Sequence, residues 1–256
     1  MSKIIVLGAA GSLGKHVVRQ AAAAGHKVTA IVRSPEKIRT EISGIVALRA
    51  MDLAEIPLSG LSDAIHGHDA LINTAGNVAD GQVFVDLLDR IVAAVEAIPA
   101  VERPVSWFMA GAGLLDIDGS GRRGVDLPKI GTTYWPHRAN FERIASTSLD
   151  WRILCPGPMV EGPGMGIDKL RTSVDTLPVA VPLIIKKLPN PLVLPFFASR
   201  IQEMIVAYED AAALMLANLQ PGGSMSHRRI GLALPVGMRG RKQPQPTARA
   251  VTYSMR

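Results

Sequence analysis

Short apolar runs and longer amphipathic segments alternate through the first 157 residues of the chain. The apolar runs predict strands at residues 3–8, 27–33, 45–49, 69–76, 104–111 and 150–157. The amphipathic segments predict helices at residues 12–25, 80–98 and 132–147, and a helix at 208–219 precedes a short strand at 228–234. Because near-continuous apolar strands alternate with helices, we expect a parallel sheet covered on both faces. The predicted fold class is therefore α/β, a doubly wound parallel sheet of the Rossmann type.

The helix predicted at residues 80–98 has the clearest apolar stripe. Its apolar residues recur every three or four positions, at Val83, Leu87, Leu88, Ile91, Val95 and Ile98. Packing on the sheet explains such a stripe, and pairing with a second copy in a homodimer would also use it. The sequence does not separate these two interpretations.

Beyond Pro156 the regular alternation gives way to a proline-rich segment. In open parallel sheets the ligand lies at the carboxyl ends of the strands, so we expect residues 156–206 to form a small irregular region that covers a substrate. The chain contains no interdomain linker pattern, and one domain over residues 1–236 is predicted. Residues 237–256 are expected to form a basic tail that is partly disordered.

The net charge of +6 belongs to the carboxy-terminal end of the chain. Residues 227–256 hold seven basic residues and no acidic one, whereas the rest of the chain carries 21 basic and 22 acidic residues. A nucleic-acid surface on the folded body is therefore not expected, and a small molecule is the predicted partner.

Two further features restrict the class of protein. The single cysteine, Cys155, lies in an apolar run, so we expect a buried thiol rather than a nucleophile. Residues 177–197 are strongly apolar, but five prolines and the pair Lys186 and Lys187 argue against a membrane-spanning helix. The apolar run at the amino terminus is too short for a signal sequence, so a cytoplasmic protein without a metal site is expected.

Three glycines stand three residues apart in the stretch GAAGSLG, between the first predicted strand and the first predicted helix. A turn of this kind directs free backbone N–H groups and the positive end of the helix dipole at one point, which suits a phosphate. Gly8 permits the tight turn, Gly11 lets the backbone approach a pyrophosphate, and Gly14 allows the helix to pack closely on the sheet. In this context the motif predicts dinucleotide binding.

The residue after the second strand bears on which dinucleotide binds. An acidic residue about 20 positions beyond the glycines would bind the ribose 2′-hydroxyl of NAD, but Arg33 stands there. A guanidinium suits a 2′-phosphate, which favours NADP over NAD, and the alternative is a surface arginine that ends a strand. Asp52 is a candidate acceptor for the adenine amino group with Leu53 against the ring, and a turn cap is an equally good interpretation of Asp52.

The stretches GAAGSLG and INTAG resemble the short-chain dehydrogenase/reductase superfamily in its atypical branch. LDWRILCPGPMVEGPG, after a helix with HRANFERI, and YEDAAALMLANL resemble its NmrA-like and biliverdin/flavin-reductase-like members. The resemblance, good over residues 3–165 and weaker over 205–235, implies a nicotinamide cofactor across the strand ends. Ala75 and Gly76 would then lie beside the adenosine ribose, and Pro156 beside the nicotinamide. The residues implied for the pyrophosphate are Gly8, Ala10, Gly11, Ser12, Leu13 and Gly14.

The same resemblance implies a catalytic Tyr-x-x-x-Lys pair, whose positions here are Tyr134 and Arg138. A cation one helical turn from the phenol would favour its ionised form and hold the nicotinamide ribose. Arginine does not give up its proton, so Arg138 would bind and polarise without relaying a proton. Pro136 is tolerated only in a first helical turn, which places Tyr134 at or before the helix start.

The hydroxyl residue with which this superfamily polarises a substrate carbonyl is missing. The fifth strand ends in FMAGAGLL, and Ser106 lies too early, inside the strand. An oxyanion donor contributes about 100-fold or more in rate, so ordinary carbonyl chemistry is disfavoured, while conjugated acceptors such as flavins and quinones need less assistance. His137 is a further candidate proton donor, although a lone histidine on a helix is more often structural.

Three functions are consistent with these residues. The preferred one is an NAD(P)H-dependent oxidoreductase that transfers hydride to a bulky or conjugated small molecule. The alternative is a non-catalytic, NADP-sensing regulatory protein of the NmrA type, which suits the missing hydroxyl and the substituted lysine. A sugar-nucleotide epimerase or dehydratase is disfavoured, because the usual carboxy-terminal bulk and both catalytic partners are missing.

Overall fold

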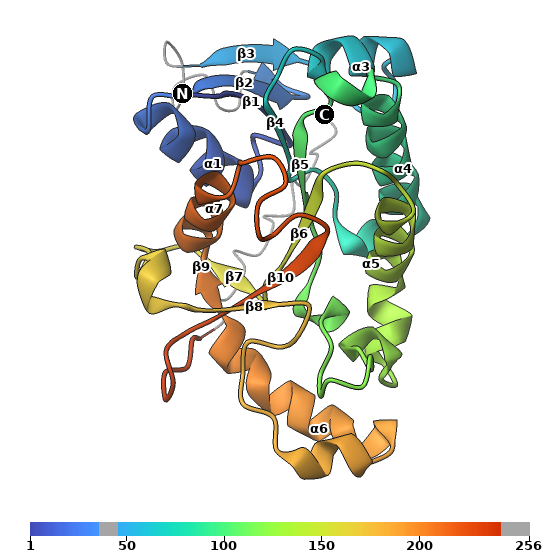
Figure 1. Cartoon of the computed structure of the whole chain (residues 1–256), viewed down its shortest axis with the longest axis vertical. Helices are drawn as coiled ribbons and strands as arrows, with labels where there is room; N and C mark the ends of the chain where they lie inside the picture. Colours follow the sequence, from blue (N-terminus) through green and yellow to red (C-terminus); the bar gives the residue numbers. More distant parts are fainter. Residues whose placement is uncertain (36–45, 242–256) are drawn as a thin grey trace, which may run out of the picture.

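In the computed structural model, which describes residues 1–35 and 46–241, eight strands form one sheet in the order β3-β2-β1-β4-β5-β6-β10-β8 (Figure 1). Neighbouring strands are parallel, except that β8 is antiparallel to β10. The strands are β1 (Lys3–Leu7), β2 (Lys27–Val32), β3 (Ala47–Ala50), β4 (Ala70–Asn73), β5 (Val105–Met109), β6 (Trp151–Cys155), β8 (Arg171–Val174) and β10 (Arg228–Ala233). The order reverses between β1 and β4, so the predicted Rossmann-type sheet is confirmed and its ligand site is expected at that reversal.

Helices cover both faces of the sheet, as the apolar strands require. On one face lie α1 (Ser12–Ala23) and α7 (Tyr208–Ala217), which pack against each other. On the other face lie α3 (Leu58–Ile65), α4 (Gln82–Glu96) and α5 (Ile130–Ala145), as the two sides of Figure 1 show. Each face has its own buried apolar cluster, and Trp107 and Phe108 of β5 are fully buried on opposite sides. The central strands are therefore shielded from water on both faces.

The apolar stripe of α4 differs at its start from the predicted one. Val83 is 67% exposed, and the neighbouring Phe84 is buried in its place. The reason lies at the helix start, where the Phe84 ring packs on the bare backbone of Gly76. From Leu88 onward the predicted and observed stripes agree.

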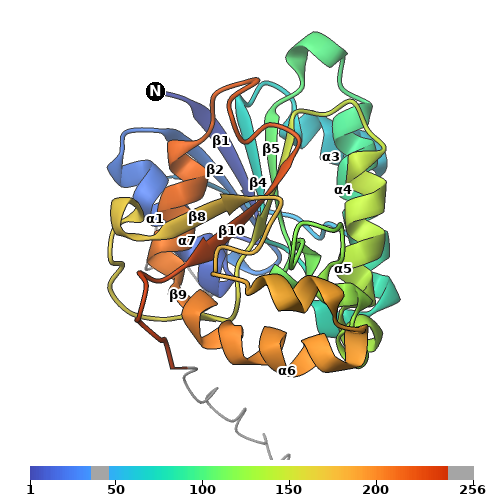
Figure 2. The same cartoon turned by 60° about the horizontal axis from the view of Figure 1, so that its bottom comes forward.

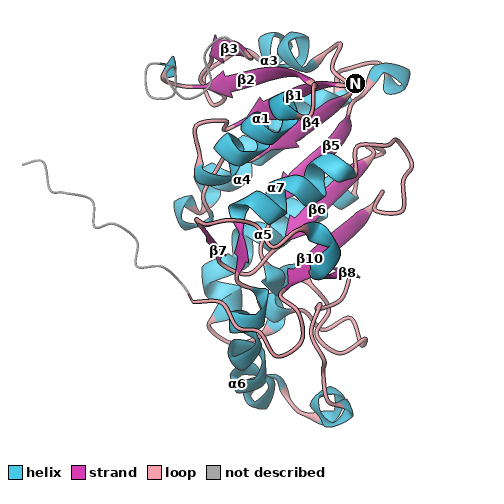
Figure 3. Ribbon diagram, turned by 90° about the vertical axis from the view of Figure 1, so that its left-hand side faces the viewer, coloured by secondary structure: helices cyan, strands magenta, loops and turns pink. Residues whose placement is uncertain are grey.

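The segment after β6 contains regular elements that the sequence pattern does not reveal. A small parallel pair forms from β7 (Met159–Val160) and β9 (Val206–Ala207), and an eleven-residue helix, α6 (Asn190–Arg200), lies beyond the β8 edge of the sheet (Figures 1 and 3). Short 3-10 helices connect the larger elements of the chain: η2 (Val78–Asp80), η3 (Ala100–Glu102), η4 (Ala112–Leu114), η5 (Gly124–Asp126), η6 (Ile167–Lys169), η7 (Leu183–Lys187) and η8 (Ile201–Met204). The predicted covering region, residues 156–206, thus contains strands and helices as well as loops.

The first residues of the predicted basic tail are hydrogen-bonded to the folded body. The Gly240 amide donates to the Gln202 carbonyl at 2.8 Å, whereas residues 242–256 of the predicted tail lie outside the described residues. Part of the third predicted strand, residue 45, also lies outside them. Within the described part of the chain, no helix has the length and apolar character needed to cross a bilayer.

Candidate functional site

The glycine turn lies between β1 and α1, against the end of β4. Gly8 has a φ of +74°, and a Cβ at this position would stand 2.7 Å from the Ala75 amide nitrogen. A Cβ at Gly14 would overlap the Gly8 carbonyl oxygen and lie 2.8 Å from Ala9 Cα. Both glycines are therefore required for the close approach of the turn, the helix and the neighbouring strand end.

The amino terminus of α1 is not capped by a side chain. Gly11 is the N-cap residue and offers no side chain to the first-turn amides, although its own N–H donates to the Gly8 carbonyl at 2.9 Å. Ala10, Gly11 and Ser12 are exposed, while Leu13 and Gly14 are buried. The first-turn amides of this twelve-residue helix have no side-chain acceptor, and at its positive end they form a cradle suited to an anion. The side chain of Leu13 contributes to the core beneath this cradle.

Two polar residues at the end of β4 shape the turn from below. The Thr74 hydroxyl donates to the Leu7 carbonyl at 2.8 Å and lies 3.2 Å from the Gly8 carbonyl. The Asn73 side-chain oxygen accepts from the Ala75 amide at 3.0 Å. The Thr74 bonds connect the end of β4 to the glycine turn, and the Asn73 bond fixes the backbone that follows β4; neither role was assigned from the sequence. The signal available in the sequence was their position in INTAG, directly after a buried strand.

A row of rings from α4 and α5 lies against the backbone that follows β4. Gly76 has a φ of +101°, and any side chain there would overlap the Phe84 ring. The Phe84 ring meets the His137 ring edge to face at 5.9 Å, and His137 stacks on Tyr134 at 6.0 Å with the planes 9° apart. The bare backbone of Gly76 is therefore required to admit the first ring of this row.

His137 takes the space next to the backbone at the end of β5. A Cβ built on Gly111 would lie 3.5 Å from His137 Nε2. Burial lowers the pKa of His137 to about 4, so its ring is neutral near pH 7. Its Nδ1 is buried without a hydrogen-bond partner among the described residues, and the same holds for both side-chain polar atoms of Asn140, one turn further along α5. Such buried atoms are normally hydrogen-bonded to protein, water or a ligand, so these side chains can still form hydrogen bonds with a molecule bound here.

The predicted catalytic pair is separated by a kink. Tyr134 has non-helical dihedrals inside α5 (φ −109°, ψ 19°), so regular helix resumes only after it, as the restriction from Pro136 predicts. The Arg138 guanidinium donates to the Val125 carbonyl at 2.7 Å and to Asp126 Oδ1 at 2.6 Å. Tyr134 is 41% exposed and stacks on His137. Arg138 therefore holds η5 in place, and its charge is already paired.

No side-chain hydroxyl marks the end of β5. Gly111 and Ala112 follow the strand, and Ser106 is fully buried within it, donating to the Pro104 carbonyl. Pro156, at the end of β6, is buried, and its carbonyl accepts from the Ala112 amide at 2.8 Å. The carboxyl ends of β5 and β6 are thus joined by backbone and present no hydroxyl at the site.

Residues 8–178, more than half of the chain, match a protein family described as NAD(P)H-binding. The chain belongs to the NAD(P)H-binding family. The match begins at the first glycine of the turn and ends within the covering region, so it includes the uncapped end of α1 and the ends of β4, β5 and β6.

Individual relatives of this NAD(P)H-binding chain are distant. The uncharacterised protein YwnB of Bacillus subtilis is 27% identical over 168 residues, which cover 63% of this chain and 75% of that protein. The structure of a proposed NADH-flavin reductase from Streptococcus pneumoniae is similar with a TM-score of 0.65 at 21% identity, over 91% of this chain and all of that one. The anaerobilin reductase ChuY of Escherichia coli O157:H7 is similar with a TM-score of 0.60 at 16% identity, over 91% of this chain and 98% of that one. At these identities the solved structures support the fold.

The residues predicted to select the dinucleotide lie at the ends of β2 and β3. Arg33 is exposed directly after β2, on the same side of the sheet end as the glycine turn. Asp52 accepts from the Ala54 amide at 3.0 Å, which is the turn-cap interpretation. Leu53 is buried in the core that also holds Leu61. The adenine contacts expected of Asp52 and Leu53 remain predictions.

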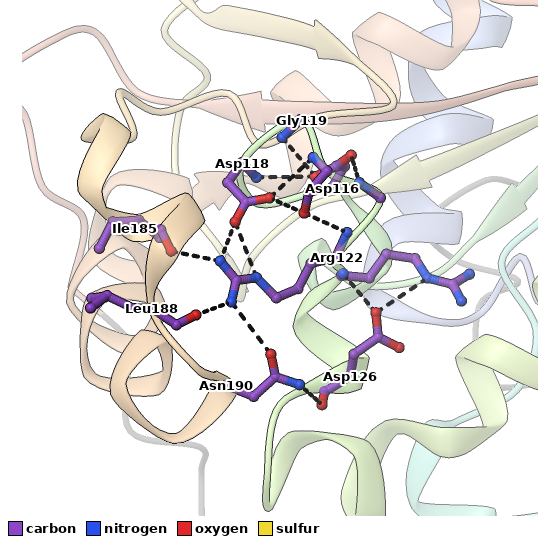
Figure 4. Close-up of polar contacts among 11 residues, drawn as sticks. Asp116, Asp118, Gly119, Arg122, Asp126, Ile185, Leu188 and Asn190 are labelled. Carbon is purple, nitrogen blue, oxygen red and sulfur yellow. Dashed lines mark hydrogen bonds and ion pairs between the residues drawn. The ribbon is translucent and has the colours of Figure 1, made fainter.

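The loop between η4 and η5 forms hydrogen bonds to the covering region (Figure 4). Asp116 accepts from three backbone amides of the loop, and Asp118 pairs with Arg122. The Arg122 guanidinium also donates to the carbonyls of Ile185 and Leu188, at 2.6 and 2.5 Å. Burial of the Asp118 carboxyl opposes its ionisation, but hydrogen bonds from Ser120 and Arg122 outweigh this and lower its pKa.

A cavity of 410 Å³ opens between η5, the start of α5 and the start of α6. Asp126, Lys129, Trp135, Arg138 and Asn190 are among its lining residues, and neither Tyr134 nor His137 is. Within the described residues, no cluster of histidine, cysteine, aspartate or glutamate has the geometry of a metal site. Cys155 is fully buried, and burial raises the pKa of its thiol, which disfavours a nucleophilic role.

Proposed function

We propose that this protein is an NADPH-dependent reductase that transfers hydride to a bulky or conjugated small molecule. The observation that carries the proposal is the combination, at the ends of β4 and β5, of an aromatic row with a strand end that lacks a hydroxyl. An acceptor such as a flavin, quinone or linear tetrapyrrole spreads the charge of the added hydride over conjugated atoms. It therefore depends less on an oxyanion donor than an isolated carbonyl does.

The chain's residues divide the work in this proposal. The uncapped end of α1 would hold the pyrophosphate, and Gly76, which has no side chain, admits the Phe84 ring at the end of β4. The reduced nicotinamide supplies two electrons and one hydrogen as hydride, and the acceptor takes up one proton in addition. Tyr134, with its exposed ring beside that row, is the proposed proton donor, and Arg138 positions η5. The 410 Å³ cavity beside Trp135 has the size of a small-ligand pocket and lies next to this site.

The names of structural relatives support the same class of reaction. The relatives from Streptococcus pneumoniae and Escherichia coli are called NADH-flavin and anaerobilin reductases. Both names denote a reductase, and the first also names a nicotinamide as the reductant and a flavin as the acceptor. The atypical short-chain dehydrogenase/reductase branch, which the motifs resemble, remains our proposed classification.

Turnover is the direct test. The purified protein is mixed with NADPH and with flavins, quinones, linear tetrapyrroles and aldehydes, and loss of absorbance at the reduced-nicotinamide band is followed. We expect turnover with at least one conjugated acceptor and little with aldehydes. Tyr134→Phe should lower kcat, because it removes the hydroxyl and keeps the ring. The matched variant Tyr208→Phe, on α7, should not. Full activity of Tyr134→Phe would assign the proton to water.

A second function is favoured by one specific observation. Arg138 is committed to Asp126, and Gly111 has no side chain, so two catalytic groups of the resembled superfamily are lost together. A protein that senses NADP and regulates a partner would need neither. Tight NADPH binding with no turnover of any acceptor in the panel would support this sensor and overturn the reductase.

The preference for NADP is a separate proposal, supported by the exposed Arg33 at the end of β2. Arg33→Asp is expected to weaken NADPH binding about 10-fold or more, which is 1.4 kcal/mol or more, and to leave NADH binding unchanged. Lys27→Asp makes the same charge change at the opposite end of the same strand and serves as the control. Equal NADPH affinities for wild type and Arg33→Asp would overturn the NADP preference.

A further inference from the structure

The covering region carries an exposed apolar tip. We define the tip as η7, Leu183–Lys187, together with Leu192 of α6. Leu183 is 90% exposed, Ile184 is 59% exposed and Leu192 is 59% exposed. Single exposed apolar residues are common on protein surfaces, but adjacent ones on a projecting element mark an interaction site. Figures 2 and 3 show this region at the margin of the molecule, beyond the β8 edge of the sheet.

The tip also has a one-sided charge. Lys186 and Lys187 follow the buried Ile185 directly, one residue beyond the exposed Leu183 and Ile184, and both lysines are exposed. The sequence contains no aspartate or glutamate from Thr176 to Gln202. The carboxylate of Asp118, which lies beneath η7, is paired with Arg122 and almost fully buried. Among residues 1–35 and 46–241, no carboxylate forms an ion pair with either lysine, so the tip presents apolar side chains beside positive charge.

The outward direction of Leu183 and Ile184 is fixed by what lies beneath them. Ile185 of the same turn is buried in the core, and its carbonyl accepts from Arg122 at 2.6 Å. Since one side chain of this short helix points inward, its neighbours in the sequence must point elsewhere. The bonds drawn in Figure 4 hold η7 against the body, while Leu183 and Ile184 stay exposed.

We propose that this tip docks the protein on an anionic lipid surface. Leu183, Ile184 and Leu192 would enter the boundary between headgroups and acyl chains, and Lys186 and Lys187 would lie among the anionic headgroups. The segment has apolar and basic side chains together, as interfacial segments do, and it is too short and too interrupted by proline to span a bilayer. This proposal does not depend on the redox function.

The alternative occupant is a protein partner or a second copy of this chain. Interfaces between proteins are depleted of lysine at their centre, whereas Lys186 and Lys187 lie in the same short helix as Leu183, the most exposed apolar residue of the tip. Charge complementarity therefore favours an anionic bilayer. A protein partner becomes an outcome of the experiment.

Vesicle sedimentation tests the proposal with the full chain. The vesicles are pure phosphatidylcholine or a mixture with phosphatidylglycerol, and the partition coefficient of the protein is measured. We expect binding to the anionic vesicles that is weakened by salt. Leu183→Ser with Ile184→Ser should lower the partition coefficient about 10-fold or more, and Lys186→Gln with Lys187→Gln should lower it roughly 30-fold, as expected for two lysines near an anionic surface.

Matched variants separate the tip from general surface properties. Val83→Ser with Val101→Ser removes two exposed apolar side chains elsewhere, and Arg239→Gln with Arg241→Gln removes two exposed charges elsewhere. Both controls should bind nearly as wild type does. The proposal is overturned by no sedimentation with anionic vesicles, by equal effects of tip and control variants, or by self-association that only the tip variants abolish.

Discussion

Replacing Gly14 with alanine tests whether the glycine turn is set by packing. Gly14 is the third residue of α1, and Gly60 is the third residue of α3, so the two positions share their place in a helix. Alanine is normally the better helix former at such a position. At Gly14, however, the added methyl group would overlap the Gly8 carbonyl oxygen and lie 2.8 Å from Ala9 Cα. At Gly60 its nearest neighbours are Cγ1 and Cδ1 of Ile56, at 3.1 and 3.2 Å.

The expected change in the free energy of unfolding depends on whether the atoms next to the new methyl group can move. The atoms near Gly14 belong mainly to the backbone of a turn fixed by Thr74, so we take overpacking at the upper end of its range, about 3 kcal/mol. The helix propensity of alanine returns about 1 kcal/mol. The net loss in the free energy of unfolding is then about 2 kcal/mol, which lowers Tm by about 4–8 °C. At Gly60 the Ile56 side chain can rotate, so the variant should be unchanged or more stable by up to about 1 kcal/mol.

Urea unfolding of the two variants measures stability, and calorimetry measures NADPH affinity. A displaced amino terminus of α1 should weaken NADPH binding by Gly14→Ala about 10-fold, which is 1.4 kcal/mol. Gly60→Ala should bind as wild type does. If Gly14→Ala is as stable as Gly60→Ala and binds NADPH normally, the turn does not need glycine for packing.

Three further predictions concern single contacts. Thr74→Val loses the hydroxyl bond to the Leu7 carbonyl and should lower the free energy of unfolding in urea by about 1 kcal/mol; Thr132→Val, at an exposed site, should stay within about 0.5 kcal/mol. Since burial lowers the pKa of His137 from 6.5 to about 4, the unfolded chain binds more protons between these values. The contribution of the neutral His137 ring to the free energy of unfolding is complete above pH 6.5 and is lost as the pH falls toward 4. His137→Gln should therefore flatten the decline of the unfolding free energy over that range, and an unchanged slope would contradict this. Arg122→Met leaves Asp118 buried without its cation and should cost about 3 kcal/mol by the same urea assay, with recovery in the double variant Asp118→Leu, Arg122→Met.

The sequence predicts the sheet and most of its helices because one physical signal specifies them. Strands buried on both faces must be apolar throughout, and helices that cover them must be apolar on one side. The core of residues 3–33 and 69–157 follows from this rule with shifts of a few residues. The glycine turn can also be recognised in the sequence, because a side chain at Gly8 or Gly14 would overlap the backbone and only glycine fits at these positions.

Other features depend on contacts that no local pattern encodes. The helix α6 has two prolines and apolar residues around much of its surface, so its sequence resembles a loop, and its order comes from packing on η5. Arg138 matches a motif position, yet its charge is taken by Asp126, twelve residues earlier. Phe84 replaces Val83 in the core because of Gly76. Each of these depends on a neighbour that only the folded chain brings close.

The protonation state of His137 limits the chemistry of the site. A group with a pKa of about 4 is protonated in about one molecule in a thousand at pH 7. In the proposed reduction, His137 is therefore protonated too rarely to be the main proton donor, and its neutral ring stacks on Tyr134. The proposed sources of the proton are then Tyr134 and solvent. Both sources suit an acceptor whose added charge is already delocalised, which is why the missing hydroxyl at Gly111 and the neutral His137 point to the same class of substrate.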